Sequence, residues 1–341
     1  MLYRPMEVEN ISQYGDLIDS LIDEIRKTAG DKDLYIAFSG GLDSSVVAIL
    51  SKLAIGPSRV TLVTTKFDFT YPQTIEIVKN FAISNGLKHV FVDGSEWQRK
   101  IWRSGPACNA CTRGPKLESV KKYANGIVVT GAELEDTWGQ QGIKMNNGFY
   151  SPLSSLSRTQ IEEIAKILGI KINKIGENAK REGCILKHLL KMMSSFEFHG
   201  KSVYDANVAL MKILNNIDLN FEIANVKIVG PLSKNLALIN LSPLPQEDVM
   251  NSVKSEISKI PQISNVDIVD RPIKLKIIAN PGIYNDPKAR YWIEKGRLQP
   301  DFATPITVEW RISSNNRLNT FQVVDYEFLN AVIKTRSSPS I

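Results

Sequence analysis

The segment Tyr35–Val47, with the sequence YIAFSGGLDSSVV, constrains this chain more than any other. Its apolar first half is typical of a buried strand, and an amphipathic helix begins directly after its two glycines. Glycine lets a backbone approach an anion with positive φ, and the N–H groups of a helix N terminus carry partial positive charge. The segment therefore predicts a phosphate-binding loop, with hydroxyl donors in Ser39, Ser44 and Ser45, rather than a helix that Asp43 or Ser44 merely caps.

Residues 39–44 read Ser-Gly-Gly-Leu-Asp-Ser and resemble the SGGxDS signature of the PP-loop ATP pyrophosphatases. No lysine follows the glycines, which separates this loop from the GxxxxGK[ST] loop. The resemblance implies that a substrate oxygen attacks the α-phosphate of ATP, pyrophosphate leaves, and a nitrogen or sulfur nucleophile then displaces AMP. The residues that it implies for ATP binding are Ser39, Gly40, Gly41, Asp43, Ser44, Ser45 and Gly131.

Apolar runs alternate with helical patterns and predict an α/β fold with a doubly wound parallel sheet. After a helical lead-in over 1–30, we expect an ATP-binding domain over 31–197, with the nucleotide at the carboxyl ends of the strands. Its expected strands are 34–38, 60–65, 88–93 and 126–131, and its expected helices are 44–54, 71–85, 113–124 and 157–168.

Beyond residue 200 the pattern predicts a second, α+β domain over 200–336, in which we find no chemical motif. We expect this domain to select the substrate or to form a homodimer. Its expected helices are 201–216, 246–258 and 323–335, its expected strands are 221–229, 236–241, 264–269, 273–279 and 306–312, and a loop is expected over 280–305.

Composition places the chain among globular proteins. Its 341 residues are 43% apolar and 23% charged, enough for two domains with their own cores. A formal net charge of +6 permits a polyanionic partner such as tRNA. No apolar run approaches the ~20 residues of a membrane span, and three cysteines favour a reducing compartment, so we expect a cytoplasmic protein without membrane contact.

Acidic side chains at the carboxyl ends of predicted strands are candidate ligands for the magnesium ion that accompanies ATP. Asp43 and Asp136 are the first candidates because Mg²⁺ usually takes one or two carboxylates and phosphate oxygens. Glu133 and Glu135 are the alternatives. Candidate cations for phosphate charge are Arg113, Lys144, Arg158 and Arg181.

The cysteines form a C-x-x-C pair, Cys108 and Cys111, with Cys184 further along. Four interpretations stay open. Three thiolates could hold a 4Fe–4S cluster, or His188 could complete a tetrahedral zinc site. The pair could instead carry redox or persulfide chemistry, or the thiols could be buried as small apolar groups.

The order of motifs over residues 34–190 resembles the tRNA thiolases of the PP-loop family, in which a C-x-x-C precedes a basic helix, a strand with a TGHNLDD-like turn and a third cysteine. Here the turn reads Thr-Gly-Ala-Glu-Leu-Glu-Asp over 130–136, so the match is in order more than in identity. The resemblance implies ATP-dependent sulfur insertion into a tRNA base, with a 4Fe–4S cluster and a sulfur donor that is sulfide or a carrier protein. Its expected catalytic residues are Asp43, Cys108, Cys111, Asp136 and Cys184.

Two other functions stay open from the sequence. One is sulfur transfer or amidation on a small-molecule cofactor precursor. The other is a nucleotide-binding regulatory protein without turnover, which pyrophosphate release would distinguish from an enzyme.

Overall fold

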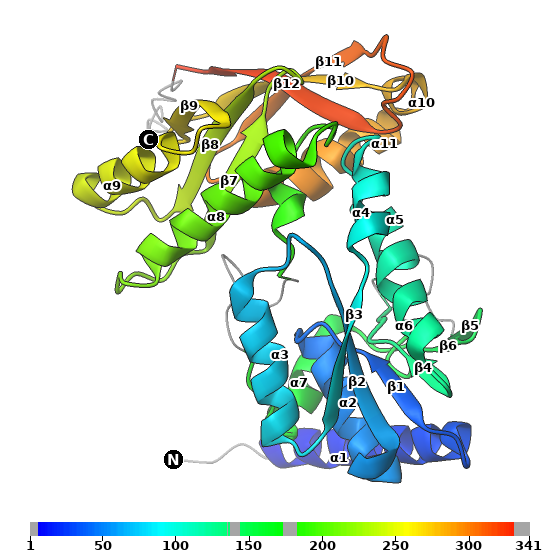
Figure 1. The fold of residues 1–341 in the computed structure, drawn as a ribbon. Coiled ribbons are helices and arrows are strands. Elements are labelled where there is room, and N and C mark those ends of the chain that lie inside the picture. The colour runs from blue at the N-terminus through cyan, green and yellow to red at the C-terminus, as the bar shows by residue number, and fades with distance from the viewer. Residues whose placement is uncertain (1–5, 135, 137–143, 173–182, 331–341) are drawn as a thin grey trace, which may run out of the picture. The chain divides into compact units, whose positions relative to one another are not determined.

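The computed structural model describes residues 6–134, 136, 144–172 and 183–330 (Figure 1). The chain divides into two compact units. Unit 1 comprises Met1–Gln98 and Cys108–Cys184, and unit 2 comprises Arg99–Ala107 and Ile185–Ile341. Each unit is described by itself below.

Unit 1 is built on a six-stranded, mostly parallel sheet with the order β3-β2-β1-β4-β6-β5. β1 lies at its centre and pairs in parallel with both β2 and β4. The doubly wound parallel sheet predicted from the apolar runs is thus confirmed. The strands are β1 (Leu34–Ala37), β2 (Val60–Lys66), β3 (Lys88–Asp93), β4 (Ile127–Val129), β5 (Met145–Asn146) and β6 (Phe149–Tyr150).

Helices cover both faces of this sheet (Figure 1). On one face, α1 (Met6–Ala29) and α7 (Arg158–Ile167) pack against α2 (Leu42–Ile55), and α3 (Pro72–Ser84) joins the same apolar core. On the other face, α6 (Ser119–Tyr123) packs against β2 and β3. The remaining helical segments of unit 1 are η1 (Pro57–Arg59), α5 (Cys108–Cys111) and the π-helix η2 (Thr112–Glu118), while α4 (Ser95–Trp102) runs from unit 1 into unit 2.

The connections leave β1 and β4 in opposite directions along the sheet. From β1 the chain passes through α2 to β2 on one side, whereas β4 is followed by the β5–β6 hairpin on the other. In an open α/β sheet, ligands bind in the crevice that such a reversal opens at the carboxyl ends of the strands. The segments that follow β1 and β4, residues 38–45 and 130–134, lie at this reversal.

The short hairpin of β5 and β6 was not predicted, although the sequence carries its signal. Asn147 and Gly148 form the two-residue turn with φ of 51° and 82°. Both values are positive, as a type I′ hairpin turn requires, and Asn-Gly is the pair that adopts it most readily.

Unit 2 contains two three-stranded sheets, with the orders β7-β8-β9 and β11-β10-β12. α8 packs against β7, and α9 packs against β9. Its strands are β7 (Ile223–Val229), β8 (Asn235–Ser242), β9 (Ile263–Ile268), β10 (Ile273–Ala279), β11 (Ile306–Ile312) and β12 (Phe321–Phe328). Its helical segments are η3 (Ile185–His188), η4 (Phe196–Gly200), α8 (Lys201–Leu214), α9 (Glu247–Ser258), α10 (Pro281–Asn285), α11 (Pro287–Tyr291), η5 (Trp292–Leu298) and η6 (Gln299–Asp301).

Two expectations for unit 2 are wrong. The expected loop over 280–305 is largely helical, because β10 and β11 pair in parallel and a parallel pair needs a crossover connection. The expected helix over 323–335 is the strand β12 as far as Phe328, since this segment pairs antiparallel with β10; residues 331–335 lie outside the described part of the chain. In the described residues, no helix combines the length and the apolar character that crossing a membrane would require.

A buried charge network lies between the elements of unit 2. The Lys227 ammonium donates to Asp301 Oδ2 at 2.9 Å and contacts His188 Nδ1 at 2.8 Å. The side chains of Lys227 and Asp301 are only 1% and 9% exposed. A buried ion pair adds little net stability, but removal of one partner leaves the other charge without compensation in a medium of low polarity.

We therefore expect Asp301→Ala to lower the free energy of unfolding of the protein by about 3–5 kcal/mol, measured by urea denaturation. Asp325→Ala is the matched control, because its ion pair with Lys276 is 29% and 50% exposed. That control should cost no more than about 1 kcal/mol. Equal losses of unfolding free energy in the two variants would contradict the view that Asp301 compensates the buried charge of Lys227.

Candidate nucleotide site at the carboxyl edge of the sheet

The loop between β1 and α2 has the geometry of an anion cradle. Gly40 adopts a φ of +77°, and a Cβ at this position would lie 2.9 Å from Val78 Cγ1, so both conformation and space require glycine. Gly41 is the N-cap of α2, and no side chain caps the helix. The first N–H groups of α2 thus have no intrahelical acceptor, and they are available to an anion at the positive end of the helix.

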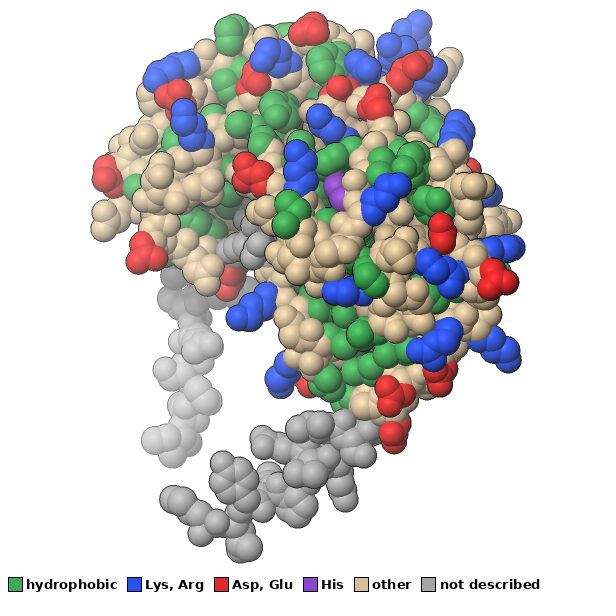
Figure 2. All heavy atoms as spheres, turned by 60° about the horizontal axis from the view of Figure 1, so that its bottom comes forward, with side chains coloured by type: hydrophobic (Ala, Val, Ile, Leu, Met, Phe, Trp, Pro, Cys, Tyr) green, Lys and Arg blue, Asp and Glu red, His purple; other side chains and the backbone are tan. Residues whose placement is uncertain are grey.

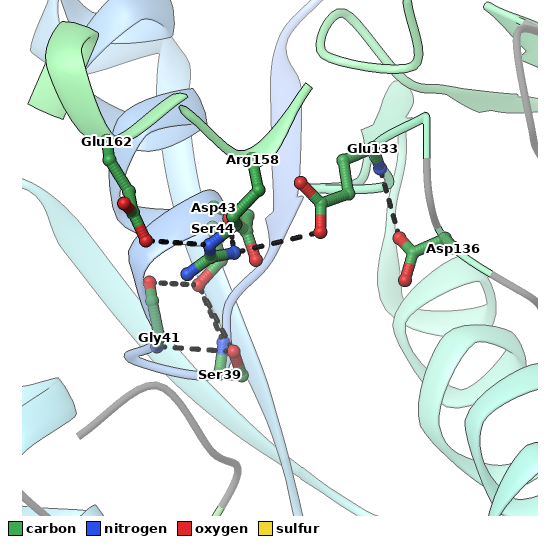
Figure 3. A network of polar contacts seen from close by, with 8 residues as sticks. All are labelled: Ser39, Gly41, Asp43, Ser44, Glu133, Asp136, Arg158 and Glu162. Carbon is green, nitrogen blue, oxygen red and sulfur yellow. Dashed lines mark hydrogen bonds and ion pairs between the residues drawn. The ribbon is translucent and has the colours of Figure 1, made fainter. Parts of the chain in front are cut away.

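Hydroxyl groups hold this loop in shape. Ser44 Oγ donates to the carbonyl of Gly41 at 3.1 Å and lies 3.2 Å from Ser39 Oγ. Ser39 Oγ in turn accepts the N–H of Gly41 at 3.3 Å (Figure 3). The predicted roles of Ser39 and Ser44 as phosphate donors are therefore joined by a local one, the stabilisation of the turn itself. Asp43 and Ser44 do not cap α2, which removes the simpler interpretation of the motif.

Ser45 is the third hydroxyl of the motif. The residue is fully buried, and its Oγ has no hydrogen-bond partner among the described residues. A buried hydroxyl without a partner is uncommon in folded proteins. A phosphate oxygen at the N terminus of α2 would be a suitable acceptor for it.

Gly131, which follows β4, brings the second loop against the first. A Cβ at Gly131 would lie 2.8 Å from Ser44 N and 2.9 Å from the carbonyl carbon of Asp43. The two backbones can approach this closely only because residue 131 has no side chain. The contact joins the loops after β1 and β4, as the sequence predicted for two parts of one site.

The two predicted magnesium ligands act on each other. Burial raises the pKa of the Asp43 carboxyl above its usual value; the positive charge of Arg158 opposes this shift, and the negative charge of Asp136 adds to it. Arg158 Nη1 donates to Asp43 Oδ1 at 2.7 Å, and Asp136 Oδ2 accepts the N–H of Glu133 at 3.0 Å (Figure 3). Two neighbouring carboxylates beside a phosphate cradle fit the donor set that Mg²⁺ prefers.

Arg158 is the cation of the site. Besides Asp43, its guanidinium contacts Glu133 Oε1 at 3.8 Å and Glu162 Oε1 at 3.3 Å (Figure 3). The Ser157 N-cap, reinforced by the side chain of Gln160, fixes the start of α7 and so places Arg158 on its first turn.

The other candidate residues lie elsewhere or are not described. Lys144 pairs with Glu24 of α1, and Arg113 is an exposed residue of η2. Glu135 and Arg181 lie outside the described residues. Of the four predicted cations, the structure thus brings Arg158 to the cradle.

The structure gives no support to the predicted metal centre of the cysteines. Among the described residues, which include Cys108, Cys111, Cys184 and His188, no three His, Cys, Asp or Glu side chains are arranged to hold a metal ion. His188 is buried in unit 2, with its Nδ1 at Lys227. The expected 4Fe–4S cluster or zinc site thus finds no support in the described residues, because the spacing of cysteines along the chain does not determine their arrangement in space.

Sequence analysis missed two polar residues beside Cys184. Gln98 Nε2 donates to Cys184 Sγ at 3.7 Å. Burial lowers the pKa of the Lys116 ammonium to about 8, while the negative charges of Cys184, Asp136 and Cys111 act in the opposite direction. The only signal in the sequence was the position of Lys116 on the predicted basic helix after the C-x-x-C.

Basic and acidic side chains are mixed on the face that Figure 2 shows. Lysine and arginine side chains are scattered there among aspartate and glutamate. The described residues visible in this view form no continuous basic stripe of the kind that nucleic-acid-binding proteins use.

Comparison with known proteins adds to this geometry. Residues 13–100 match a family model described as NAD synthase. The chain is 38% identical over 95 residues to a GMP synthase (glutamine-hydrolyzing) of Aquifex aeolicus; the aligned stretch covers 28% of this chain and 18% of that protein. It is 26% identical over 179 residues to a GMP synthase (glutamine-hydrolyzing) of Ligilactobacillus salivarius; that stretch covers 46% of this chain and 35% of that protein. In both cases the chain spans less than two thirds of the relative.

These similarities overturn the expected tRNA thiolation. The matching proteins are glutamine-hydrolyzing GMP synthases and the NAD synthase family, so the likeness to tRNA thiolases in the order of motifs was misleading about function. The departures at Ala132 and Glu133, where the thiolase turn has His and Asn, agree with this correction.

The close approach at Gly131 generates a prediction. Gly131→Ala should displace the start of α2 and weaken ATP binding about tenfold, or about 1.4 kcal/mol, measured as the Kd for MgATP by isothermal titration calorimetry. Gly15→Ala is the control, because Gly15 lies within α1 and a Cβ added there would have no neighbouring atom within 4 Å. It should keep the ATP affinity and raise the free energy of unfolding by about 0.5–1 kcal/mol. Unchanged affinity in Gly131→Ala would argue against an ATP site at this contact.

Proposed function

We propose that this chain, a member of the PP-loop ATP pyrophosphatase superfamily, cleaves ATP to AMP and pyrophosphate in order to activate a substrate oxygen, and that a nitrogen nucleophile then replaces AMP. The observation that carries the proposal is the uncapped N terminus of α2 with its three serines, in contact with the loop after β4.

The charge that develops in the reaction matches this cradle. As the substrate oxygen bonds to the α-phosphorus, the bond to the bridging oxygen breaks and negative charge accumulates on the departing pyrophosphate. The first N–H groups of α2 and the hydroxyl of Ser45, which have no partner among the described residues, would donate to these oxygens. Arg158 neutralises part of the remaining negative charge at Asp43.

Asp43 and Asp136 would hold a magnesium ion, which neutralises phosphate charge when bound. Burial raises the pKa of Asp43, and repulsion from Asp136 adds to that shift; a divalent cation between the two carboxylates would relieve both effects. Arg158 also supplies a positive charge to Asp43, through an ion pair at 2.7 Å.

The relatives support nitrogen rather than sulfur as the second nucleophile. Their names describe glutamine hydrolysis, a reaction that releases ammonia. We therefore propose amidation of an activated carbonyl carbon, with ammonia or a small amine as the nucleophile and a small molecule as the substrate.

The test is the identity of the products. The protein is incubated with α-phosphate-labelled ATP, Mg²⁺, ammonium chloride and a filtered extract of small metabolites, and the labelled products are separated. We expect labelled AMP and an equal amount of pyrophosphate, and we expect Asp43→Asn to lower their formation by about 10²–10³-fold, as for loss of one preorganised electrostatic group. The control Asp325→Ala, on the exposed surface of β12, should keep full turnover. ADP with orthophosphate, or nucleotide binding without any product, would refute the proposal.

A further inference from the structure

Cys184 is held beside the carboxyl end of β2 by backbone contacts. It forms an isolated antiparallel bridge with Thr70, and the carbonyl of the preceding Gly183 accepts the N–H of Tyr71 at 2.8 Å. A Cβ at Gly183 would lie 1.6 Å from Thr74 Oγ1, so this approach depends on glycine. The thiol is therefore fixed at the same edge of the sheet as the nucleotide cradle.

A buried amide points at the Cys184 sulfur. Gln98 is 1% exposed, and its Nε2 donates to Cys184 Sγ at 3.7 Å. Its Oε1 is also buried and has no hydrogen-bond partner among the described residues. The amide thus stabilises negative charge on sulfur and leaves one buried acceptor for a ligand that carries an N–H group.

A lysine supplies positive charge to the same thiol. The backbone of Lys116 is anchored at the end of β2, because Thr65 Oγ1 donates to its carbonyl at 2.8 Å. The ammonium group interacts electrostatically with Cys184, Asp136 and Cys111. Since such interactions are mutual, the positive charge of Lys116 attracts negative charge on the Cys184 sulfur. Asp136 interacts with Lys116 and also with Asp43 of the cradle.

We propose that Cys184 is a thiolate nucleophile that attacks the activated carbon of the adenylated substrate. This inference rests on the proposed function and adds a covalent step to it. The Cys184 sulfur forms a bond to the carbon, the carbon–oxygen bond to AMP breaks, and AMP leaves with the bonding electrons. The nitrogen nucleophile then adds to the same carbon, the carbon–sulfur bond breaks, and the proton lost by nitrogen goes to the departing sulfur. Lys116 and Gln98 are positioning residues that act through the thiol.

Iodoacetamide, a soft carbon electrophile, tests the thiol without any substrate. The full-length protein is treated at pH 7, and peptide mass spectrometry follows the alkylation of each cysteine. We expect Cys184 to react about tenfold faster than Cys108 in the same chain, as a stabilised thiolate does. Lys116→Met should slow Cys184 about tenfold, whereas Lys116→Arg should keep its rate within about threefold, because the positive charge remains.

Lys122→Met is the matched control. It removes a lysine from α6 whose ammonium lies 5.6 Å from the centre of the Trp97 ring, and it should leave the rate at Cys184 unchanged. Circular dichroism verifies that each variant is folded. If Lys116→Met does not fold, the alkylation rate of Cys184 in Lys116→Arg is compared with that in the wild type instead. Equal rates at Cys184 and Cys108, or a Cys184 rate that is independent of the charge at residue 116, would overturn the proposal.

A second measurement tests the covalent step. In the product assay above, with ammonium chloride omitted, intact-protein mass spectrometry should show an adduct on Cys184 that hydroxylamine removes and that Cys184→Ser lacks. Pyrophosphate release by the wild-type protein without such an adduct would overturn the covalent step and leave the proposed function standing. Absence of pyrophosphate release would count against the proposed function, while the alkylation rates still decide whether Cys184 is a stabilised thiolate.

Discussion

The free N–H groups at the start of α2 are the constraint on which the rest of this structure depends. A helix N terminus needs acceptors, and here no side chain provides one. α2 is also held rigidly, because Val46, Val47 and Leu50 on its inner face are fully buried against the sheet. The unsatisfied donors are therefore fixed in direction at the reversal between β1 and β4, where a bound anion would accept their hydrogen bonds. For the proposed phosphate site, the donors would thus already be in place before the ligand binds.

Charges around this cradle are arranged in a sequence of opposite signs. The positive end of α2 is followed by the carboxylates of Asp43 and Asp136, with Arg158 between Asp43 and Glu133. Lys116 interacts electrostatically with both Asp136 and Cys184. Each charge is thereby near one of opposite sign, which lowers the cost of its partial burial. A nucleotide bound together with a divalent cation would bring both negative and positive charge to this arrangement. Such a pair therefore fits it better than an anion or a cation alone.

Local patterns predicted most of the fold, and the two errors in unit 2 have one physical cause. The strands β1 to β4, the helices α2, α3 and α7 and the loop of Ser39–Ser45 follow from apolar periodicity and glycine positions, which are properties of neighbouring residues. The segment over 280–305 was misread because its helices are required by the parallel pairing of β10 with β11, a contact between residues far apart in the chain. β12 was misread for the same reason, since its extended form depends on pairing with β10. The hairpin at Asn147 and Gly148 was local and could have been found.

The cysteines show the same limit at the level of chemistry. A C-x-x-C with a distant third cysteine is compatible with a cluster, a zinc site, a redox pair or buried thiols, because spacing fixes neither the distances nor the neighbours of the sulfur atoms. In the folded protein the surroundings of Cys184 come from α4 through Gln98, from η2 through Lys116 and from the segment after β2 through Thr70. These elements meet because all of them follow, or pack at, the carboxyl ends of parallel strands. The edge of the sheet that gathers the phosphate donors therefore also gathers the groups that decide whether a thiol there is inert or nucleophilic.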